Sequence, residues 1–131
     1  MNSAALNVFG FRTWHPLNLS TEKTLLASLP SRTGVYAIRC SNAHRSFGPS
    51  DLVYFGKATN ADGLKRRITQ YFHPGHGNQT SLRIRAEFAD CTDFELSWIE
   101  YPADQAAQVE SLLIAGYEKA HGALPPWNKQ R

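Results

Sequence analysis

The sequence predicts a small α/β domain, of the α+β type, in which a mainly antiparallel three-stranded sheet is flanked by helices. Three segments, residues 34–40, 52–57 and 93–101, have the alternation or the β-branched and aromatic content of strands. Residues 103–120 have apolar side chains at helical spacing, which predicts a long helix packed on the sheet. Because 131 residues suffice for one core and leave little room for a second, we expect one compact domain.

The amino-terminal part of the chain carries the weakest pattern. Residues 1–29 are expected to form an accessory segment packed on a domain of residues 30–131. Within this segment, residues 7–11 have the content of a short edge strand, and a helix is expected to begin near Ser20. The first two predicted strands then pair as an antiparallel hairpin, and the loop between them is rich in Ser, Asn, Gly and Pro.

A basic helix follows the second strand after a polar turn. Leu64, Ile68 and Phe72 recur at helical spacing and mark its buried side. Arg67 and Tyr71 lie four residues apart on an adjoining stripe, so they face the end of the preceding strand. The remaining predicted elements are a loop rich in helix breakers at residues 72–78 and a short helix at residues 81–88.

Charge is distributed unevenly between the two parts of the chain. Residues 1–85 hold 11 Lys and Arg against 3 Asp and Glu, whereas residues 86–131 hold 3 against 8. A concentration of cations suits a polyanion such as nucleic acid, because neutralising phosphates releases counterions. A solvated basic face explains the same pattern, so charge alone does not choose between the two.

The composition and the residue patterns exclude further classes of protein. No apolar run is long enough to span a membrane and no secretory pattern opens the sequence, so we expect a cytoplasmic protein with no membrane partner. Cys40 and Cys91 do not have metal-ligand spacing, and we interpret them as buried thiols. His73 and His76 have no matching cysteines, which argues against a zinc site.

Glu110 is the sharpest single candidate for a functional residue. It shares a helical stripe with Ala106, Leu113 and Tyr117, and a carboxylate is costly to bury there unless it is paired, protonated or bound to a cation. On the residues alone, an ion pair with Arg67 and metal binding are both open. One carboxylate suits a single Mg²⁺ or Mn²⁺, because Mg²⁺ keeps several waters and takes further ligands from substrate phosphates.

Two tyrosines and two cations are expected to face one another. Tyr36 and Tyr54 lie on paired strands, and a tyrosine with an ordinary pKa of about 10 needs nearby positive charge to accept a proton near neutral pH. Lys57 and Arg67 supply such charge, and the planar fork of Arg67 suits phosphate oxygens. The alternative is that both tyrosines are packing residues of the strands with their hydroxyls at the surface.

These residues belong to five motifs that follow one another along the chain. The motifs are Thr33-Gly34-Val35-Tyr36, Val53-Tyr54-Phe55-Gly56, Gly56-Lys57-Ala58 with the run from Leu64 to Phe72, Glu110-Ser111-Leu112-Leu113-Ile114, and Pro126-Trp127-Asn128. In this order they resemble the GIY-YIG nuclease superfamily over roughly residues 29–128, and in particular the nuclease domains of bacterial excision repair. The stretch between the glutamate and asparagine motifs is longer than in those domains, which makes the asparagine the weakest match.

The resemblance implies a fold and a role for each motif residue. The family fold is a small, mainly antiparallel three-stranded sheet flanked by helices. Tyr54 is implied as the general base, with Tyr36 as its partner in positioning the water. The resemblance also implies that Lys57 and Arg67 bind the scissile phosphate and that Tyr71 lies beside them. Glu110 is implied to bind one Mg²⁺ or Mn²⁺ ion, and Asn128 to brace the site. Further contacts with nucleic acid are expected at Arg66, His73, Arg83 and Arg85.

The function implied by the resemblance is a metal-dependent DNA endonuclease of low or structure-directed specificity, as in DNA repair, that leaves 3′-hydroxyl and 5′-phosphate ends. We expect a stand-alone domain, so specificity would come from residues 1–30, the loops at 41–50 and 73–77, or a protein partner. Two alternatives from other classes stay open. They are a non-catalytic nucleic-acid-binding module and a structural subunit of a DNA repair or mobile-element assembly.

Overall fold

The computed structural model describes residues 1–42, 47–75, 79–89 and 92–128. Its elements in chain order are η1 (Ser3–Phe9), β1 (His15–Pro16), η2 (Leu19–Thr21), α1 (Glu22–Ser28), β2 (Gly34–Cys40), β3 (Leu52–Ala58), α2 (Gly63–Phe72), α3 (Gln79–Ala89), β4 (Phe94–Glu100) and α4 (Ala103–His121). The predicted class, an antiparallel sheet flanked by helices, is confirmed.

The sheet has four antiparallel strands within the described residues, in the order β1-β4-β2-β3. Strand β2 lies between β4 and β3 and pairs with both along its length. The three predicted strands are β2, β3 and β4. The fourth strand, β1, was not predicted; it pairs His15 with Leu96 and Pro16 with Glu95. A two-residue strand is too short to carry an alternating pattern, so no periodic signal marks it in the sequence.

The prediction of an edge strand at residues 7–11 is wrong, because this stretch belongs largely to the 3₁₀ helix η1 and its end. The side chain of Asn2 caps the first turn by accepting a hydrogen bond of 3.1 Å from the Ala5 N–H. Gly10 ends the helix with a φ of +104°, which glycine adopts without strain. Signals at both ends therefore favour a helical turn over an extended strand.

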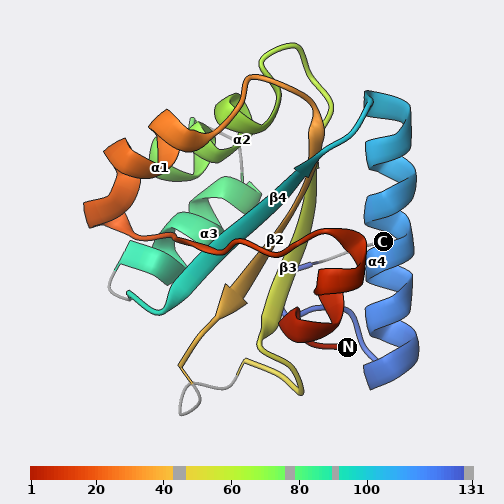
Figure 1. Cartoon of the computed structure of the whole chain (residues 1–131). Helices are drawn as coiled ribbons and strands as arrows, with labels where there is room; N and C mark the ends of the chain where they lie inside the picture. The colour runs from red at the N-terminus through yellow and green to blue at the C-terminus, as the bar shows by residue number, and fades with distance from the viewer. Residues whose placement is uncertain (43–46, 76–78, 90–91, 129–131) are drawn as a thin grey trace.

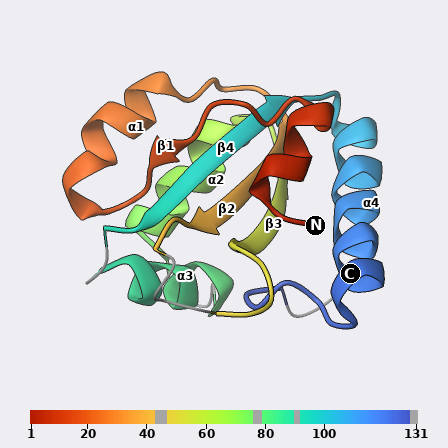
Figure 2. The same ribbon diagram turned by 60° about the horizontal axis from the view of Figure 1, so that its bottom comes forward.

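The sheet separates two hydrophobic cores. Helices α1, α2 and α3 cover one face and α4 with η1 covers the other (Figure 1), an arrangement that Figure 2 shows from a second direction. Alternation along β2 divides its side chains between the cores, with Tyr36 and Ile38 in the first and Val35 and Ala37 in the second. The predicted basic helix and the predicted last helix therefore lie on opposite faces.

The close packing of β2, β3 and α2 depends on one glycine. Tyr36 lies opposite Gly56 in the β2–β3 ladder, and a Cβ at residue 56 would lie 2.3 Å from Cζ of Tyr36. The tyrosine ring therefore occupies the space of the missing side chain. Its hydroxyl is hydrogen-bonded to that of Tyr71 on α2, and both tyrosines are fully buried.

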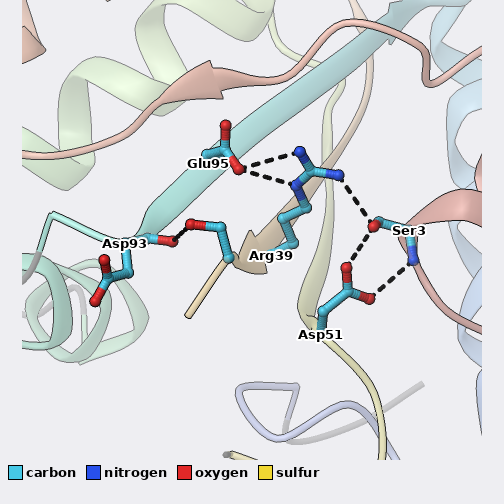
Figure 3. A network of polar contacts seen from close by, with 6 residues as sticks. Ser3, Arg39, Asp51, Asp93 and Glu95 are labelled. Atoms are coloured by element: carbon cyan, nitrogen blue, oxygen red, sulfur yellow. Dashed lines mark hydrogen bonds and ion pairs between the residues drawn. The ribbon is translucent and has the colours of Figure 1, made fainter. Parts of the chain in front are cut away.

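A polar network ties the amino-terminal segment to the sheet (Figure 3). Arg39 of β2 lies 3.1 Å from the carboxylate of Glu95 on β4 and donates a hydrogen bond of 3.0 Å to Oγ of Ser3. Both the N–H and the hydroxyl of Ser3 donate to the carboxylate of Asp51. The Arg39 guanidinium also lies over the ring of Trp14, 4.3 Å from its centre. The segment predicted to be accessory thus contacts β2 directly.

Other sequence expectations concern membranes and thiols. Across the part of the chain that the structure describes, no helix combines the length and apolar composition needed to cross a membrane. Cys40 is buried in the first core. Cys91 and His76 lie outside the described residues.

Gly56→Ala is expected to destabilise the protein by about 1–3 kcal/mol or more, because the added methyl group overlaps the enclosed ring of Tyr36. Gly75→Ala is the matched control, since a Cβ at residue 75 meets no atom within 4 Å. Urea-induced unfolding of both variants measures the difference. Equal stability of the two would contradict the close approach of Tyr36 to Gly56.

Candidate active site

A cleft of about 330 Å³ lies at the outer edge of β3, between α2 on one face of the sheet and α4 on the other. Five of the predicted site residues line it. They are Tyr54 and Lys57 from β3, Arg66 and Arg67 from α2, and Glu110 from α4. The edge position matters, because successive side chains of a strand point to opposite faces of the sheet, and residues from both faces can line one cleft around an open edge.

The start of α2 is fixed against the chain that leads into β2. The N–H of Leu64 donates a hydrogen bond of 2.8 Å to the carbonyl of Arg32, and the next N–H donates one of 3.1 Å to Pro30. Gly63 permits this approach, since its φ is +54° and a Cβ there would lie 2.1 Å from the Arg32 carbonyl oxygen. These contacts set the position of α2, and of its cleft-lining side chains, relative to the sheet.

Arg67 reaches the cleft from α2 and is oriented from two sides. Its Nη1 donates a hydrogen bond of 3.0 Å to Oε1 of Gln70, and its guanidinium carbon lies 5.2 Å from the ring centre of Tyr71. Burial acts to lower the pKa of Arg67, but the interactions with Tyr36 and Tyr71 outweigh it and raise that pKa above its usual value. Arg67 therefore keeps its charge in this half-buried position.

The three tyrosines of the predicted site divide into two enclosed residues and one that borders the cleft. Tyr36 and Tyr71 are fully buried, and their ring centres lie 6.0 Å apart in an edge-to-face arrangement. Burial is the main cause that raises the pKa of both above the ordinary tyrosine value, so both stay protonated at neutral pH. Tyr54 retains 8% exposure and lines the cleft. The alternative of two surface hydroxyls therefore does not hold for Tyr36.

Glu110 reaches the cleft from α4, on the other face of the sheet. Its side chain is 14% exposed, and its Oε1 lies 3.9 Å from Nζ of Lys57. Burial raises the pKa of Glu110, and the charges of Lys57 and Arg67 act against that rise. The sequence left open an ion pair with Arg67, but the cation that pairs with this carboxylate is Lys57.

The donor groups in the cleft fit a hard divalent cation that keeps most of its water. Glu110 is the one carboxylate among the described residues that line the cleft. No group of three or more His, Cys, Asp and Glu gathers anywhere in the described ranges. Mg²⁺ accepts so sparse a protein ligand set, whereas zinc requires three or four. A cation at Glu110 would stabilise the charged form that burial disfavours.

Asn128 pairs with the outer edge of β3 next to Tyr54. Its Oδ1 accepts a hydrogen bond of 3.0 Å from the N–H of Phe55, and its Nδ2 donates one of 2.9 Å to the Phe55 carbonyl. The N–H of Trp127 also donates to the carbonyl of Val53, at 2.9 Å. The side-chain amide thus takes the place of a strand partner beside the cleft, and is not itself part of the cleft lining.

Of the four further contacts predicted for nucleic acid, Arg66 lines the cleft and three do not. Those three are held by other parts of the protein. Their contacts are His73 with the Glu22 carboxylate (2.7 Å), Arg83 with the Pro126 carbonyl (3.3 Å) and Arg85 with the Phe72 carbonyl (3.3 Å). A role for these three in binding nucleic acid stays a prediction.

Two solved structures of the GIY-YIG N-terminal endonuclease domain of UvrC from Thermotoga maritima resemble this fold, with TM-scores of 0.52 and 0.51 at 23% and 25% sequence identity. They cover 84% and 82% of this chain, and 97% and 96% of their own chains. The chain has the GIY-YIG fold. The resemblance carried by its motifs is therefore confirmed. Both solved domains are bound to their catalytic divalent cation, magnesium in one of them, and the other is a point mutant.

A comparison of sequences also finds a UvrC protein similar to this GIY-YIG domain. The UvrABC system protein C of Gloeobacter violaceus is 32% identical over 108 residues, which make up 82% of this chain. The chain spans about 15% of the length of that curated relative. No family model matches the chain.

The cleft of this GIY-YIG domain also contains residues that the sequence analysis did not select. Gln70 and Thr59 both line it. Gln70 lies three residues after Arg67, and this i,i+3 spacing on one helix is the signal that would have indicated it. Thr59 lies in the turn after β3, where no periodic pattern marks a residue as facing the site.

Glu110→Gln is expected to alter how stability depends on pH in metal-free buffer. Burial raises the pKa of Glu110 in the folded state, so the folded state binds the proton more tightly than the unfolded chain does. This stabilising contribution is complete below the unfolded pKa of about 4.3 and is lost as pH rises through the folded pKa.

The wild type should therefore lose stability relative to Glu110→Gln as pH rises from the unfolded pKa of about 4.3 through the raised pKa of the folded state. Urea unfolding of both proteins across this range, with EDTA present, measures the difference. A difference that stays constant with pH would show that burial does not shift the titration of Glu110.

Asn128→Ala is expected to lower the free energy of unfolding by about 1–3 kcal/mol, because the N–H and carbonyl of Phe55 lose their partners in a half-buried place. Asn7→Ala, at an exposed position of η1, removes the same side chain without such a contact and is the control. Urea unfolding compares the two. If they are equally stable, the amide does not brace β3.

Proposed function

We propose that this GIY-YIG domain is a metal-dependent DNA endonuclease that hydrolyses phosphodiester bonds and leaves 3′-hydroxyl and 5′-phosphate ends. The observation that carries the proposal is the meeting of Tyr54, Arg67 and Glu110 around one cleft, from three different elements. A half-buried carboxylate beside cations and a tyrosine is the type of cluster that catalysis requires and that packing does not. Similarity to UvrC, whose amino-terminal domain is named an endonuclease, supports the same activity.

Tyr54 is the proposed general base. Tyr36 and Tyr71 are enclosed and their pKa values are raised by burial, so of the three tyrosines Tyr54 is the one placed to take a proton from water in the cleft. As the water oxygen bonds to phosphorus, the bond between phosphorus and O3′ breaks. The departing oxygen takes a proton from solvent water in the open cleft and becomes the 3′-hydroxyl, and the phosphate stays on the 5′ side.

Arg67 and Lys57 are proposed to bind the phosphate that is attacked. The fork of Arg67 matches two phosphate oxygens, and its interaction strengthens as negative charge grows on them. The side chain of Lys57 is 43% exposed, and its stem is flexible. Its ammonium group can therefore leave Glu110 and bind a phosphate. Arg66, the next cation in the cleft lining, is proposed to contact a neighbouring phosphate.

Glu110 is proposed to hold one divalent cation, Mg²⁺ or Mn²⁺. When bound, such an ion supplies positive charge that stabilises oxygens of the reacting phosphate. The contribution of the chain is a carboxylate fixed on α4 at the cleft, kept partly in its charged form by Lys57 at 3.9 Å.

The proposed partner is DNA, and the proposed setting is excision repair in the cytoplasm, by analogy with the UvrC relatives. Low or structure-directed specificity is proposed, with the segment 1–29 acting as an accessory part of a domain of residues 30–131 and a protein partner as a further source of specificity. Asn128 is proposed to support catalysis indirectly, through the strand that carries Tyr54.

Purified protein is expected to nick supercoiled plasmid with Mg²⁺ or Mn²⁺ and to leave it intact with EDTA. Glu110→Gln should lower the nicking rate by about a hundredfold or more, because the variant loses the negative charge that holds the cation. Glu87→Gln, on α3 outside the cleft lining, makes the same chemical change and should nick like the wild type. Gel electrophoresis of the plasmid forms follows the reaction.

The same experiment separates this function from a binding module. DNA binding that weakens with salt, with no nicking under any metal condition and no difference between wild type and Glu110→Gln, would contradict the endonuclease proposal. End labelling of the nicked product tests the 3′-hydroxyl and 5′-phosphate ends directly.

A further inference from the structure

Gln70 is a cleft residue to which the proposed reaction assigns no role. It lies on α2 in a half-buried position, one turn after Arg67, and its Oε1 accepts a hydrogen bond of 3.0 Å from Nη1 of Arg67. The ring of Tyr71 lies near the same guanidinium, 5.2 Å from its carbon. The arginine is therefore oriented by a neutral acceptor and by two enclosed tyrosines, of which Tyr71 lies beside the guanidinium and Tyr36 is a hydrogen-bond partner.

A neutral acceptor has a particular advantage beside a phosphate-binding arginine. A carboxylate at residue 70 would bind Arg67 more strongly, but it would offset the charge that a phosphate requires and would repel the DNA backbone. The carboxylate that does lie among the described cleft residues, Glu110, pairs with Lys57 instead. An amide oxygen thus fixes the direction of the Arg67 fork and leaves its full charge available.

A purely structural role does not explain this placement. A pair of side chains three residues apart on a helix contributes little to stability, and such pairs usually lie on the solvated face. Gln70 instead lines the cleft and bonds to a guanidinium that is itself half-buried. Arginine has several rotatable bonds, so a hydrogen bond to Gln70 restricts the orientations of the guanidinium further than its contacts with the tyrosines do.

We propose that Gln70 is a positioning residue, which holds the Arg67 guanidinium in the orientation that binds the phosphate in the transition state. This inference rests on the proposed endonuclease function. Because Gln70 acts through the orientation of Arg67, its loss affects the chemical step more than the affinity for DNA.

Three variants test the proposal. Gln70→Met removes the acceptor at similar volume, and Gln70→Glu keeps the acceptor and adds a charge. Gln105→Met, at an exposed position of α4, makes the same change outside the cleft and is the control. In plasmid nicking with Mg²⁺, Gln70→Met should lower kcat about tenfold or more with little change in KM. Gln70→Glu should recover much of kcat but raise KM, and Gln105→Met should behave as wild type.

A second measurement does not depend on cleavage. Nitrogen-15 NMR of the arginine side chains reports rotation of the Arg67 guanidinium, which should be slow in the wild type and in Gln70→Glu and fast in Gln70→Met. Thermal unfolding checks that each variant is folded.

The possible outcomes distinguish failure of the positioning role from failure of the endonuclease proposal. Wild-type kcat in folded Gln70→Met, or unchanged rotation of Arg67 in that variant, overturns the positioning role alone. A fall in thermal stability that accompanies the loss of kcat indicates a structural role and overturns it as well. If the wild type itself does not cleave DNA under any metal condition, the endonuclease proposal fails, and the positioning role fails with it.

Discussion

The rest of the site depends on the approach of the Tyr36 ring to the backbone of Gly56. This contact lets a large side chain cross from β2 over the neighbouring strand, where any side chain at residue 56 would block it. The ring then ends at α2, where its hydroxyl meets that of Tyr71. The distance between helix and sheet is thereby fixed by two rigid rings in a closely packed core, in which small changes of volume are costly. Arg67 lies on the same helix, so the contact also fixes where its guanidinium can reach.

The outer edge of β3 allows one cleft to collect residues from both hydrophobic cores. An interior strand keeps its two faces apart, because neighbouring strands close both sides. On β3 the carboxyl-terminal segment covers part of the edge, through Trp127 and the amide of Asn128. Beyond that point, Lys57 and Glu110 approach from the α4 side while Arg67 approaches from α2. Asn128 also satisfies the backbone groups of an edge strand that would otherwise be open to pairing with another chain.

Prediction from the sequence was accurate where neighbouring residues decide the structure, and it failed where distant residues decide it. Strands and helices with a local period were predicted within about two residues, since alternation and helical spacing are properties of the segment itself. The stretch at residues 7–11 was mispredicted because the cap from Asn2 decided its conformation. Tyr36 is buried against Gly56, and His73 is hydrogen-bonded to Glu22. In each pair the two residues are 20 or more positions apart in the sequence, so no local pattern could predict the contact. Candidate site residues, by contrast, could be selected from the sequence wherever an unusual residue marked them, above all Glu110, a carboxylate on an apolar stripe that does line the cleft.

The charge balance of the cleft bears on the order of events in the proposed reaction. Three cations, Lys57, Arg66 and Arg67, accompany the single carboxylate of Glu110 among the described residues of the lining. A divalent cation that enters alone meets this positive surplus, and it must also compete with Lys57 for the carboxylate. A phosphodiester removes both obstacles, because it adds negative charge and offers Lys57 another partner. In the proposed reaction, electrostatics therefore disfavours entry of the cation alone and favours its binding with or after the DNA, whose negative charge adds to that of Glu110.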